Sequence, residues 1–281
     1  MTGYIPIHFS LFTFHFSRIT ILLSIITVTY NSKDVIAECL SCLEKKLQHI
    51  SSEIIVIDNH STDNTIEIIK EQFPSVHVIE NVTNKGFAAA CNQGIKHSSG
   101  DFLLFLNPDI IAGEKFSFSP IIQYINEHKK TGLLGCRLLN IDGTIQTSCR
   151  TFPDIITVMF KRIRIFQIFP YAQKRVEAYI KPLSNYEEIT SADWLLGAFL
   201  FTKREIIDEV GMFDERFYMY FEDVDFCRRV HRKGYDVCYY PFIEVIHHHK
   251  RDSAKGFNRL LLIHIWSGIK YFWKWTFFRN A

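Results

Sequence analysis

The sequence lacks the glycine-rich loops that bind phosphates in many nucleotide-dependent enzymes. Neither G-x-G-x-x-G nor a Walker loop follows any candidate strand, and we find no internal repeat or low-complexity run. Those loops bring backbone N–H groups onto a dinucleotide or a triphosphate. Their absence therefore argues against an NAD-linked enzyme and against a nucleotidyltransferase with such a loop.

Acidic residues are scarce in two segments. Residues 161–175 carry five basic side chains and no acid, and Asp252 is the only acid after Lys250. Both segments mix these charges with aromatic residues, whereas the net charge of the chain is only +2. Basic amphipathic segments bind anionic lipid through charge and apolar burial. We therefore predict a cytoplasmic protein attached peripherally to the inner face of the cell membrane, and no nucleic-acid binding.

Uninterrupted apolar runs are also missing near the N-terminus. Residues 4–26 are mostly apolar but lack the basic start of a signal peptide. The residues that interrupt this run are Pro6, His8, His15 and Arg18. Such interruptions make a poor membrane-spanning helix. We expect an apolar extension over 1–20, a globular domain over 21–253 and an amphipathic, membrane-associating tail over 254–281.

The seven cysteines include one C-x-x-C pair, Cys39 and Cys42. The pair falls on a predicted helix after a strand, so a redox motif is one interpretation. However, neither Trp nor Pro flanks it, and both positions suit an amphipathic helix. We favour buried thiols in a reducing, cytosolic compartment.

The first half of the sequence alternates strands, polar turns and helices. Short, continuous runs rich in β-branched residues predict buried parallel strands at 22–29 and 53–57. Further strands are expected at 76–80 and 101–106. This alternation indicates an α/β fold with a mainly parallel sheet flanked by helices. Ligands of such sheets bind beyond the carboxyl ends of the strands. The polar clusters expected there are Tyr30-Asn31, Asp58-Asn59, Asn84-Lys85-Gly86 and Asn107-Pro108-Asp109.

The second half is less regular. We expect a hairpin around an Asp142-Gly143 turn, a strand over 192–201 and a basic, aromatic segment over 151–185. That segment is either a mobile loop packed on the core or a lid or membrane-facing element, and we favour the second. The remaining predictions are helices at 119–129, 203–210, 222–231 and 257–278, and strands at 237–240 and 244–246.

Three carboxylates lie within Glu222-Asp223-Val224-Asp225, in an aromatic setting. One interpretation is a helix start, where acids complement the helix dipole and basic residues follow. The other is a catalytic site, because apolar surroundings and neighbouring acids raise carboxylate pKa values and leave one proton acceptor near working pH.

Asp109 is a candidate metal ligand, because hard cations such as Mg²⁺ and Mn²⁺ prefer oxygen and leave positions open for phosphates. An imidazole from His247 or His248 would join it and favour Mn²⁺, although the His247-His248-His249 run also suits a polar strand end. Asp58 would either accept a hydrogen bond from a nucleotide base or cap the following helix.

Taken in order, these motifs resemble family 2 of the inverting glycosyltransferases, which have the GT-A fold. The resemblance runs from about Ile21 to Ser253, and its subgroup is the rhamnosyl- and galactofuranosyl-transferases of bacterial surface polysaccharides. The matching segments are Ser24–Asn31, Val56–Asp63, Asn84–Phe87 with Asn92 and Gly94, Leu104–Asp109, Trp194–Ala198, Gly211–Phe217, Tyr220–Asp225, Pro241 and Val245–His248.

The resemblance implies roles for individual residues. Those expected to bind the nucleotide sugar are Thr29, Tyr30, Asn31, Asp58, Asn59, Lys85, Gly86, Asn107 and Asp109. Trp194, Gly197 and Ala198 match the acceptor-side wall. Asp109 and His247 match the ligands of a divalent cation, Mg²⁺ or Mn²⁺. Asp223 matches the general base, with Glu222 beside it.

The implied reaction is a single displacement with inversion, from a nucleotide-diphosphate sugar to a hydroxyl of a glycan or lipid-linked glycan acceptor. Residues 21–110 would form the nucleotide-sugar half and 111–253 the acceptor and catalytic half. The sequence departs from the family at Asn107, where the Asp-x-Asp motif begins with Asp. This departure would allow a weaker metal site or a weaker metal dependence. It also leaves a catalytically weak or inactive, nucleotide-binding scaffold as the alternative.

Overall fold

The structure is a computed structural model that describes residues 22–113, 116–162, 166, 168–180, 185–248 and 259–277. The expected extension over 1–20 lies outside these residues, as do His249 and positions 254–258 and 278–281 of the expected tail. Within the described part of the chain, no helix is both long enough and apolar enough to cross a bilayer.

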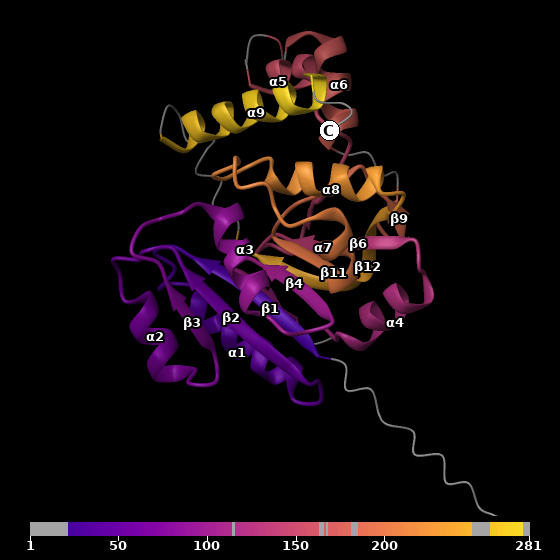
Figure 1. The fold of residues 1–281 in the computed structure, drawn as a ribbon. Helices are drawn as coiled ribbons and strands as arrows, with labels where there is room; N and C mark the ends of the chain where they lie inside the picture. Colours follow the sequence, from indigo (N-terminus) through magenta and orange to yellow (C-terminus); the bar gives the residue numbers. More distant parts are fainter. Residues whose placement is uncertain are drawn as a thin grey trace, which may run out of the picture.

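A mixed sheet forms the centre of the molecule (Figure 1). Its strands are β1 (Leu23–Thr29), β2 (Ser52–Asp58), β3 (His77–Glu80), β4 (Phe102–Leu106), β5 (Ile110–Ala112), β6 (Thr131–Leu139), β7 (Ile145–Gln146), β9 (Thr190–Ser191), β11 (Phe199–Lys203) and β12 (Asp236–His247). The order is β3-β2-β1-β4-β11-β6-β12-β5, with β7 on β6 and β9 on β12. The strands β3, β2, β1 and β4 are parallel, as are β6 and β12, whereas β11 is antiparallel to both its neighbours. The predicted α/β fold with a mainly parallel sheet is confirmed.

Helices cover both faces of this sheet. They are α1 (Ile36–Leu47), α2 (Thr65–Gln72), α3 (Phe87–His97), α4 (Ser119–Glu127), α5 (Ile155–Arg162), α6 (Pro170–Ile180), α7 (Arg204–Val210), α8 (Glu222–Arg232) and α9 (Arg259–Phe277). Strand β4 shows how the layers form, because its side chains alternate between faces. Phe102, Leu104 and Leu106 join the core under α1, α2 and α4, whereas Leu103 and Phe105 join the core under α3, α7 and α8.

Two sequence predictions were wrong in detail. The strand expected over 192–201 is divided into β10 (Trp194–Leu195), which pairs with β8 (Cys149–Arg150), and β11 in the main sheet. The division falls at Gly197, whose backbone N–H donates to Asp223 instead of to a neighbouring strand. The two strands expected over 237–246 are the single strand β12, with a register shift between Tyr240 and Glu244.

The hairpin predicted around Asp142-Gly143 is confirmed by the antiparallel pairing of β6 and β7. All seven cysteines lie within the described residues, and all are free. Cys39 is buried on α1, and its burial raises the pKa of the thiol far above its usual range. Cys42 is partly buried, so the expectation of buried thiols holds for Cys39 of the pair.

The basic segment after residue 151 forms α5 and α6, which lie beside α9 in Figure 1. Helix α9 packs one face against α8. Tyr271 and Trp275 of α9 are buried there, in the same cluster as Tyr179 of α6. The indole N–H of Trp275 donates to Asp225 over 2.9 Å, which attaches α9 to the helix of the acidic cluster.

Candidate active site

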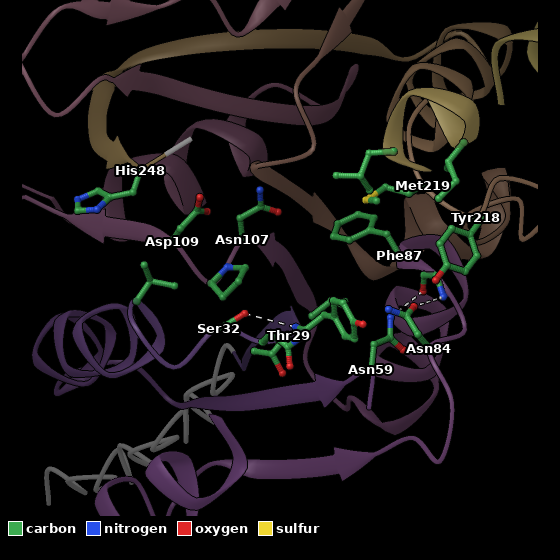
Figure 2. Close-up of a pocket in the computed structure, with 18 of the residues that line it drawn as sticks. Thr29, Ser32, Asn59, Asn84, Phe87, Asn107, Asp109, Tyr218, Met219 and His248 are labelled. Carbon is green, nitrogen blue, oxygen red and sulfur yellow. Dashed lines mark hydrogen bonds between the residues drawn. The ribbon is translucent and has the colours of Figure 1, made fainter. Parts of the chain in front are cut away.

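A cavity of about 830 Å³ opens at the carboxyl ends of β1 and β4. Figure 2 shows its two sides, with Asn107, Asp109 and His248 on one and Phe87, Met219 and Tyr218 on the other. Most of the predicted polar clusters meet here. The predicted site residues among its described lining are Thr29, Tyr30, Asn31, Asn59, Gly86, Asn107, Asp109 and His247.

Asp58 lies buried next to this cavity and is not among the described residues that line it. Its carboxylate accepts hydrogen bonds from the Thr29 hydroxyl at 2.8 Å and from the backbone N–H of Ser61 at 2.8 Å. The Ser61 hydroxyl also donates to Asp58 and accepts from the backbone N–H of Asn31. Asp58 thus joins the ends of β1 and β2 below the cavity, and its predicted contact with the base stays a prediction.

Tyr30 and Asn31 form the rim above this network. Asn31 has a left-handed backbone, with φ of 52°, which asparagine adopts more easily than most residues. Its side-chain oxygen accepts from the backbone N–H of Thr62 at 2.8 Å, so the turn is held from both sides. Tyr30 is 54% exposed and lines the cavity, which leaves its ring face available to a flat ligand.

Asn59 positions the loop that starts α3. Its amide nitrogen donates to Gly86 O at 3.1 Å, and its oxygen accepts from Asn81 at 3.0 Å. Gly86 has φ of 87°, and a Cβ there would lie 2.3 Å from the backbone oxygen of Tyr218. That oxygen accepts the N–H of Phe87 at 2.7 Å. Only glycine meets both requirements, so this loop and the aromatic segment before α8 are held together.

The Asp109 and His247 side chains meet at the other end of the cavity. Oδ1 of Asp109 lies 3.3 Å from Nε2 of His247, and the Asn107 amide nitrogen lies 3.4 Å from the same atom. Nδ1 of His247 lies 2.6 Å from Oε1 of Gln146, whose amide nitrogen donates to Asn140 at 3.1 Å. Gln146 presents an acceptor to Nδ1, so in the neutral imidazole Nδ1 carries the proton and Nε2, the nitrogen near Asp109, is free of hydrogen.

This corner fits a hard divalent cation. Carboxylate oxygen and neutral imidazole nitrogen are both suitable donors, and a histidine ligand usually donates its other N–H to a second residue, as His247 does to Gln146. No cluster of three or more His, Cys, Asp or Glu side chains that would hold a metal occurs among the described residues. Asp109 and His247 would thus leave coordination positions for phosphate oxygens and water, the usual arrangement for Mg²⁺.

The predicted base, Asp223, is buried at the start of α8. Its two oxygens accept backbone hydrogen bonds, from Gly197 at 3.0 Å and from Val224 at 2.8 Å. Burial raises the pKa of Asp223, and these N–H groups oppose the rise. Tyr220 and Phe221 both have φ of 69° just before the helix. Left-handed residues of this kind store about 1–3 kcal/mol each and cluster at functional sites.

Glu222 is buried beside Asp223. Its Oε2 has no hydrogen-bond partner within the described residues. Burial raises the pKa of Glu222 well above its usual range, and the neighbouring charge of Asp223 raises it further. Two buried acids this close disfavour joint ionisation, so their proton uptake is coupled.

The segment Gly197-Ala198 connects Asp223 to the cavity. Gly197 donates its N–H to Asp223, and the backbone oxygen of Ala198 accepts from the N–H of Asn107 at 3.0 Å. Trp194 is buried, with its indole N–H bonded to the backbone oxygen of Thr151 at 2.8 Å. The Arg150 guanidinium lies 5.2 Å from the centre of its ring. Asp223 thus lies behind the segment that was predicted as the acceptor-side wall.

Residues 24–180 match the family model described as glycosyl transferase family 2. The chain belongs to this family. It is 26% identical over 254 residues to the N-acetylglucosaminyl-diphospho-decaprenol L-rhamnosyltransferase of Mycobacterium tuberculosis, an alignment covering 84% of this chain and 79% of that protein. It is 25% identical over 256 residues to the rhamnosyltransferase WbbL of Escherichia coli, covering 88% and 91%.

Solved structures share the fold of this glycosyltransferase. GalNAc-T7 with UDP, GalNAc and Mn²⁺ superposes with a TM-score of 0.63 at 15% identity, covering 88% of this chain and 47% of that one. The mannosyltransferase PcManGT of Pyrobaculum calidifontis, in complex with GDP-Man and Mn²⁺, gives a TM-score of 0.57 at 17% identity, covering 88% and 64%. The fold is therefore GT-A, and the resemblance read from the motifs is confirmed.

Three side chains in the glycosyltransferase site were missed by sequence reasoning. Gln146 supports His247, Arg150 lies over Trp194, and Arg259 of α9 lines the cavity. Each is far in sequence from the motif that it joins, and none belongs to a motif quoted for the resemblance. By contrast, Lys85 was expected to face the donor, but its side chain is exposed and is not among the described lining residues.

Proposed function

We propose that this glycosyltransferase moves a sugar, with inversion, from a nucleotide-diphosphate donor to a hydroxyl of a lipid-linked glycan in cell-surface polysaccharide synthesis. The proposal rests on the connection between the cavity and the buried carboxylate of Asp223. Asn107 at the cavity binds Ala198, and Gly197 next to it binds Asp223. A donor in the cavity would thus lie on one side of the segment Gly197-Ala198, and the base Asp223 would lie on the other side.

The donor would occupy the cavity with its base near Tyr30 and its diphosphate near Asp109. The exposed Tyr30 ring offers a stacking face. The Asp58 network and Asn59 hold the strand ends and the Asn84-Lys85-Gly86 loop in place around the nucleoside. Preorganised polar groups of this kind fix orientation without reorganising when the ligand binds.

Asp109 and His247 would hold Mg²⁺ or Mn²⁺, with Asn107 beside them. A bound cation supplies positive charge that stabilises the departing diphosphate. Asn107 in place of aspartate removes one negative charge from this corner, so we expect weaker metal affinity than two carboxylates would provide. Both structural relatives above were solved with Mn²⁺, which supports a divalent cation here.

Asp223 would act as the general base. The acceptor O–H bond breaks and its proton passes to Asp223, while the hydroxyl oxygen forms a bond to the anomeric carbon. The bond from that carbon to the phosphate oxygen breaks, and the nucleoside diphosphate leaves with the electron pair. Glu222 keeps its own proton, so its neighbour stays ionised between turnovers. Attack from the face opposite the leaving group inverts the anomeric configuration.

The acceptor proposal draws on the relatives and on the surface of the C-terminal helix. The Mycobacterium tuberculosis relative is named for a diphospho-decaprenol acceptor. Helix α9 exposes a stripe of large apolar side chains at helical spacing. The stripe consists of Leu262, Ile265, Trp266, Ile269, Trp273 and Phe277. Exposed apolar surface of this extent marks an interaction site, and Trp suits the membrane–water interface. The enzyme would attach to the inner membrane face through α9 and the neighbouring α5 and α6.

A donor screen tests this function. UDP-, GDP- and dTDP-linked sugars are incubated with a lipid-linked N-acetylglucosamine acceptor and Mn²⁺, Mg²⁺ or EDTA, and release of the nucleoside diphosphate is measured. We expect acceptor-dependent release with one donor, and loss of release in EDTA. Binding of nucleotide sugar with no turnover under any condition would instead support the inactive scaffold, which Asn107 would then explain.

A further inference from the structure

The donor cavity contains one basic side chain of the Lys or Arg type among its described lining residues, and this is Arg259. It is the first residue of α9, and Leu260 and Ile263 of the same helix also line the cavity. The only Asp or Glu in that lining is Asp109. The cavity thus combines a carboxylate beside His247 with a guanidinium from the C-terminal helix.

Arg259 approaches from the side of Tyr218. Its charge acts on the Tyr218 hydroxyl, where it opposes the rise in pKa that burial causes. Tyr218 lies across the cavity from Asn107 and Asp109 in Figure 2. Within the described residues, Arg259 forms no ion pair. Its guanidinium is therefore a donor group that no carboxylate of the described chain neutralises.

The position of Arg259 is held by the packing of α9. Ser267 donates to the backbone oxygen of Met219 at 2.8 Å, in the segment that lines the cavity. Lys274 pairs with Asp225 at 2.6 Å and with Asp214 at 2.8 Å. Asp225 is fully buried, so this contact is screened little by solvent. Arg259 thus belongs to a helix that is attached to both the cavity wall and the base helix.

We propose that Arg259 binds the diphosphate of the nucleotide-sugar donor and supports its departure. This inference rests on the proposed function. A departing diphosphate carries several negative charges, and a cation at Asp109 and His247 would meet only one side of it. A guanidinium binds phosphate through two parallel N–H groups and stays charged at every working pH. Arg259 supplies that group on the Tyr218 side of the cavity.

A role of Arg259 in donor binding would give the C-terminal segment a second function. Residues 254–281 were expected to be a membrane tail separate from a catalytic domain over 21–253. If Arg259 binds the donor, α9 is part of the donor site, and its apolar stripe and its cavity residues are two faces of one helix. A chain cut after residue 253 would therefore lose donor affinity as well as lipid affinity.

Calorimetric titration of the full-length protein tests the proposal. UDP, GDP and dTDP are titrated at about physiological salt, and the tightest is compared with its nucleoside, in EDTA and in Mn²⁺. Arg259→Gln should weaken diphosphate binding by about 10- to 100-fold, as expected for a charge-assisted bond, and leave nucleoside binding unchanged. Arg259→Lys should recover part of the loss. Lys270→Gln, on the same helix with its amine bonded to Arg216 O, should bind like the wild type.

The outcomes separate this inference from the proposed function. If the wild type binds a diphosphate and Arg259→Gln binds it equally well, the Arg259 assignment is wrong and the proposed function stands. Equal weakening of diphosphate and nucleoside would indicate a distorted pocket and also overturn the assignment. If the wild type binds none of the three diphosphates, both proposals fail. The ligand-free melting temperature of Arg259→Gln should not fall, because a cation near a helix N-terminus is mildly unfavourable.

Discussion

The carboxylate of Asp223 accepts the backbone N–H of Gly197 at 3.0 Å. This bond joins the start of α8 to the segment between β10 and β11, and Asn107 binds the next residue, Ala198, from the cavity side. A Cβ at Gly197 would lie 3.5 Å from Asp223, an ordinary contact, so glycine is not required there for space. The bond therefore positions the proposed base relative to the donor cavity.

Replacing Asp223 with Asn should remove catalysis and keep donor binding. An amide of the same shape cannot accept the acceptor proton, and general-base catalysis contributes about 10²- to 10⁴-fold. We expect kcat to fall by at least that range while the Kd for the nucleotide diphosphate changes little. Asp208→Asn, an exposed residue of α7, is the control. Turnover retained in Asp223→Asn would remove Asp223 from the mechanism.

The pH dependence of the reaction should respond to Arg150. The charge of Arg150 lowers the pKa of Asp223, against the larger effect of burial, and Glu222 is the other acid beside it. Arg150→Met should therefore raise the pKa of Asp223 and move the acidic limb of kcat/KM to higher pH. Lys129→Met, at an exposed site, should leave the limb in place. A limb that stays fixed or moves to lower pH in Arg150→Met would contradict the assignment.

Glu222 should reduce the stability of the protein near neutral pH. Its pKa is raised in the folded state, so the folded protein holds a proton that the unfolded chain releases above about pH 4.5. Stability from this group falls as pH rises above that value, at about 1.4 kcal/mol for each unit of pKa difference. Glu222→Gln should thus have a higher melting temperature than the wild type at pH 7. The difference between the two melting temperatures should disappear below about pH 4. A difference that does not depend on pH would refute this explanation.

Gln146 should control metal affinity through His247. Without the acceptor at Nδ1 the imidazole loses its fixed tautomer and orientation, and such changes weaken metal binding about 10- to 100-fold. We expect Gln146→Ala to show that loss for Mn²⁺ in the presence of a nucleoside diphosphate, measured by electron paramagnetic resonance. Gln123→Ala, at an exposed position of α4 where the amide donates to Glu127, should match the wild type. Equal Mn²⁺ affinity in both variants would show that Gln146 has no such role.

The tryptophans of α9 should separate lipid binding from stability. Trp266 and Trp273 are each 60% exposed, whereas Trp275 is buried against α8. Trp266→Ser with Trp273→Ser should reduce co-sedimentation with anionic vesicles about 10-fold or more and leave the melting temperature unchanged. Trp275→Ala should instead cost about 3–5 kcal/mol of stability. Unchanged vesicle binding in the double variant would argue against α9 as the membrane surface.

Local sequence determined the order of the strands and helices and the polar residues at the strand ends. Continuous apolar runs such as 102–106 must be buried on both faces. Parallel strands bring their carboxyl ends to one edge of the sheet. That rule was enough to gather Asn31, Asn59 and Asn107 at one cavity. It also placed Asp109 near a histidine from the end of a distant strand.

Only the tertiary structure determined which groups the side chains of the predicted site contact. Asp58 binds the Thr29 hydroxyl, Gln146 contacts His247 across 101 positions of the sequence, and Arg259 of α9 lines the cavity. These contacts depend on how separate elements pack, and no short-range pattern of hydrophobicity records that packing. The sequence therefore supplied the candidate residues of the site, and the tertiary structure determined which side chains they contact.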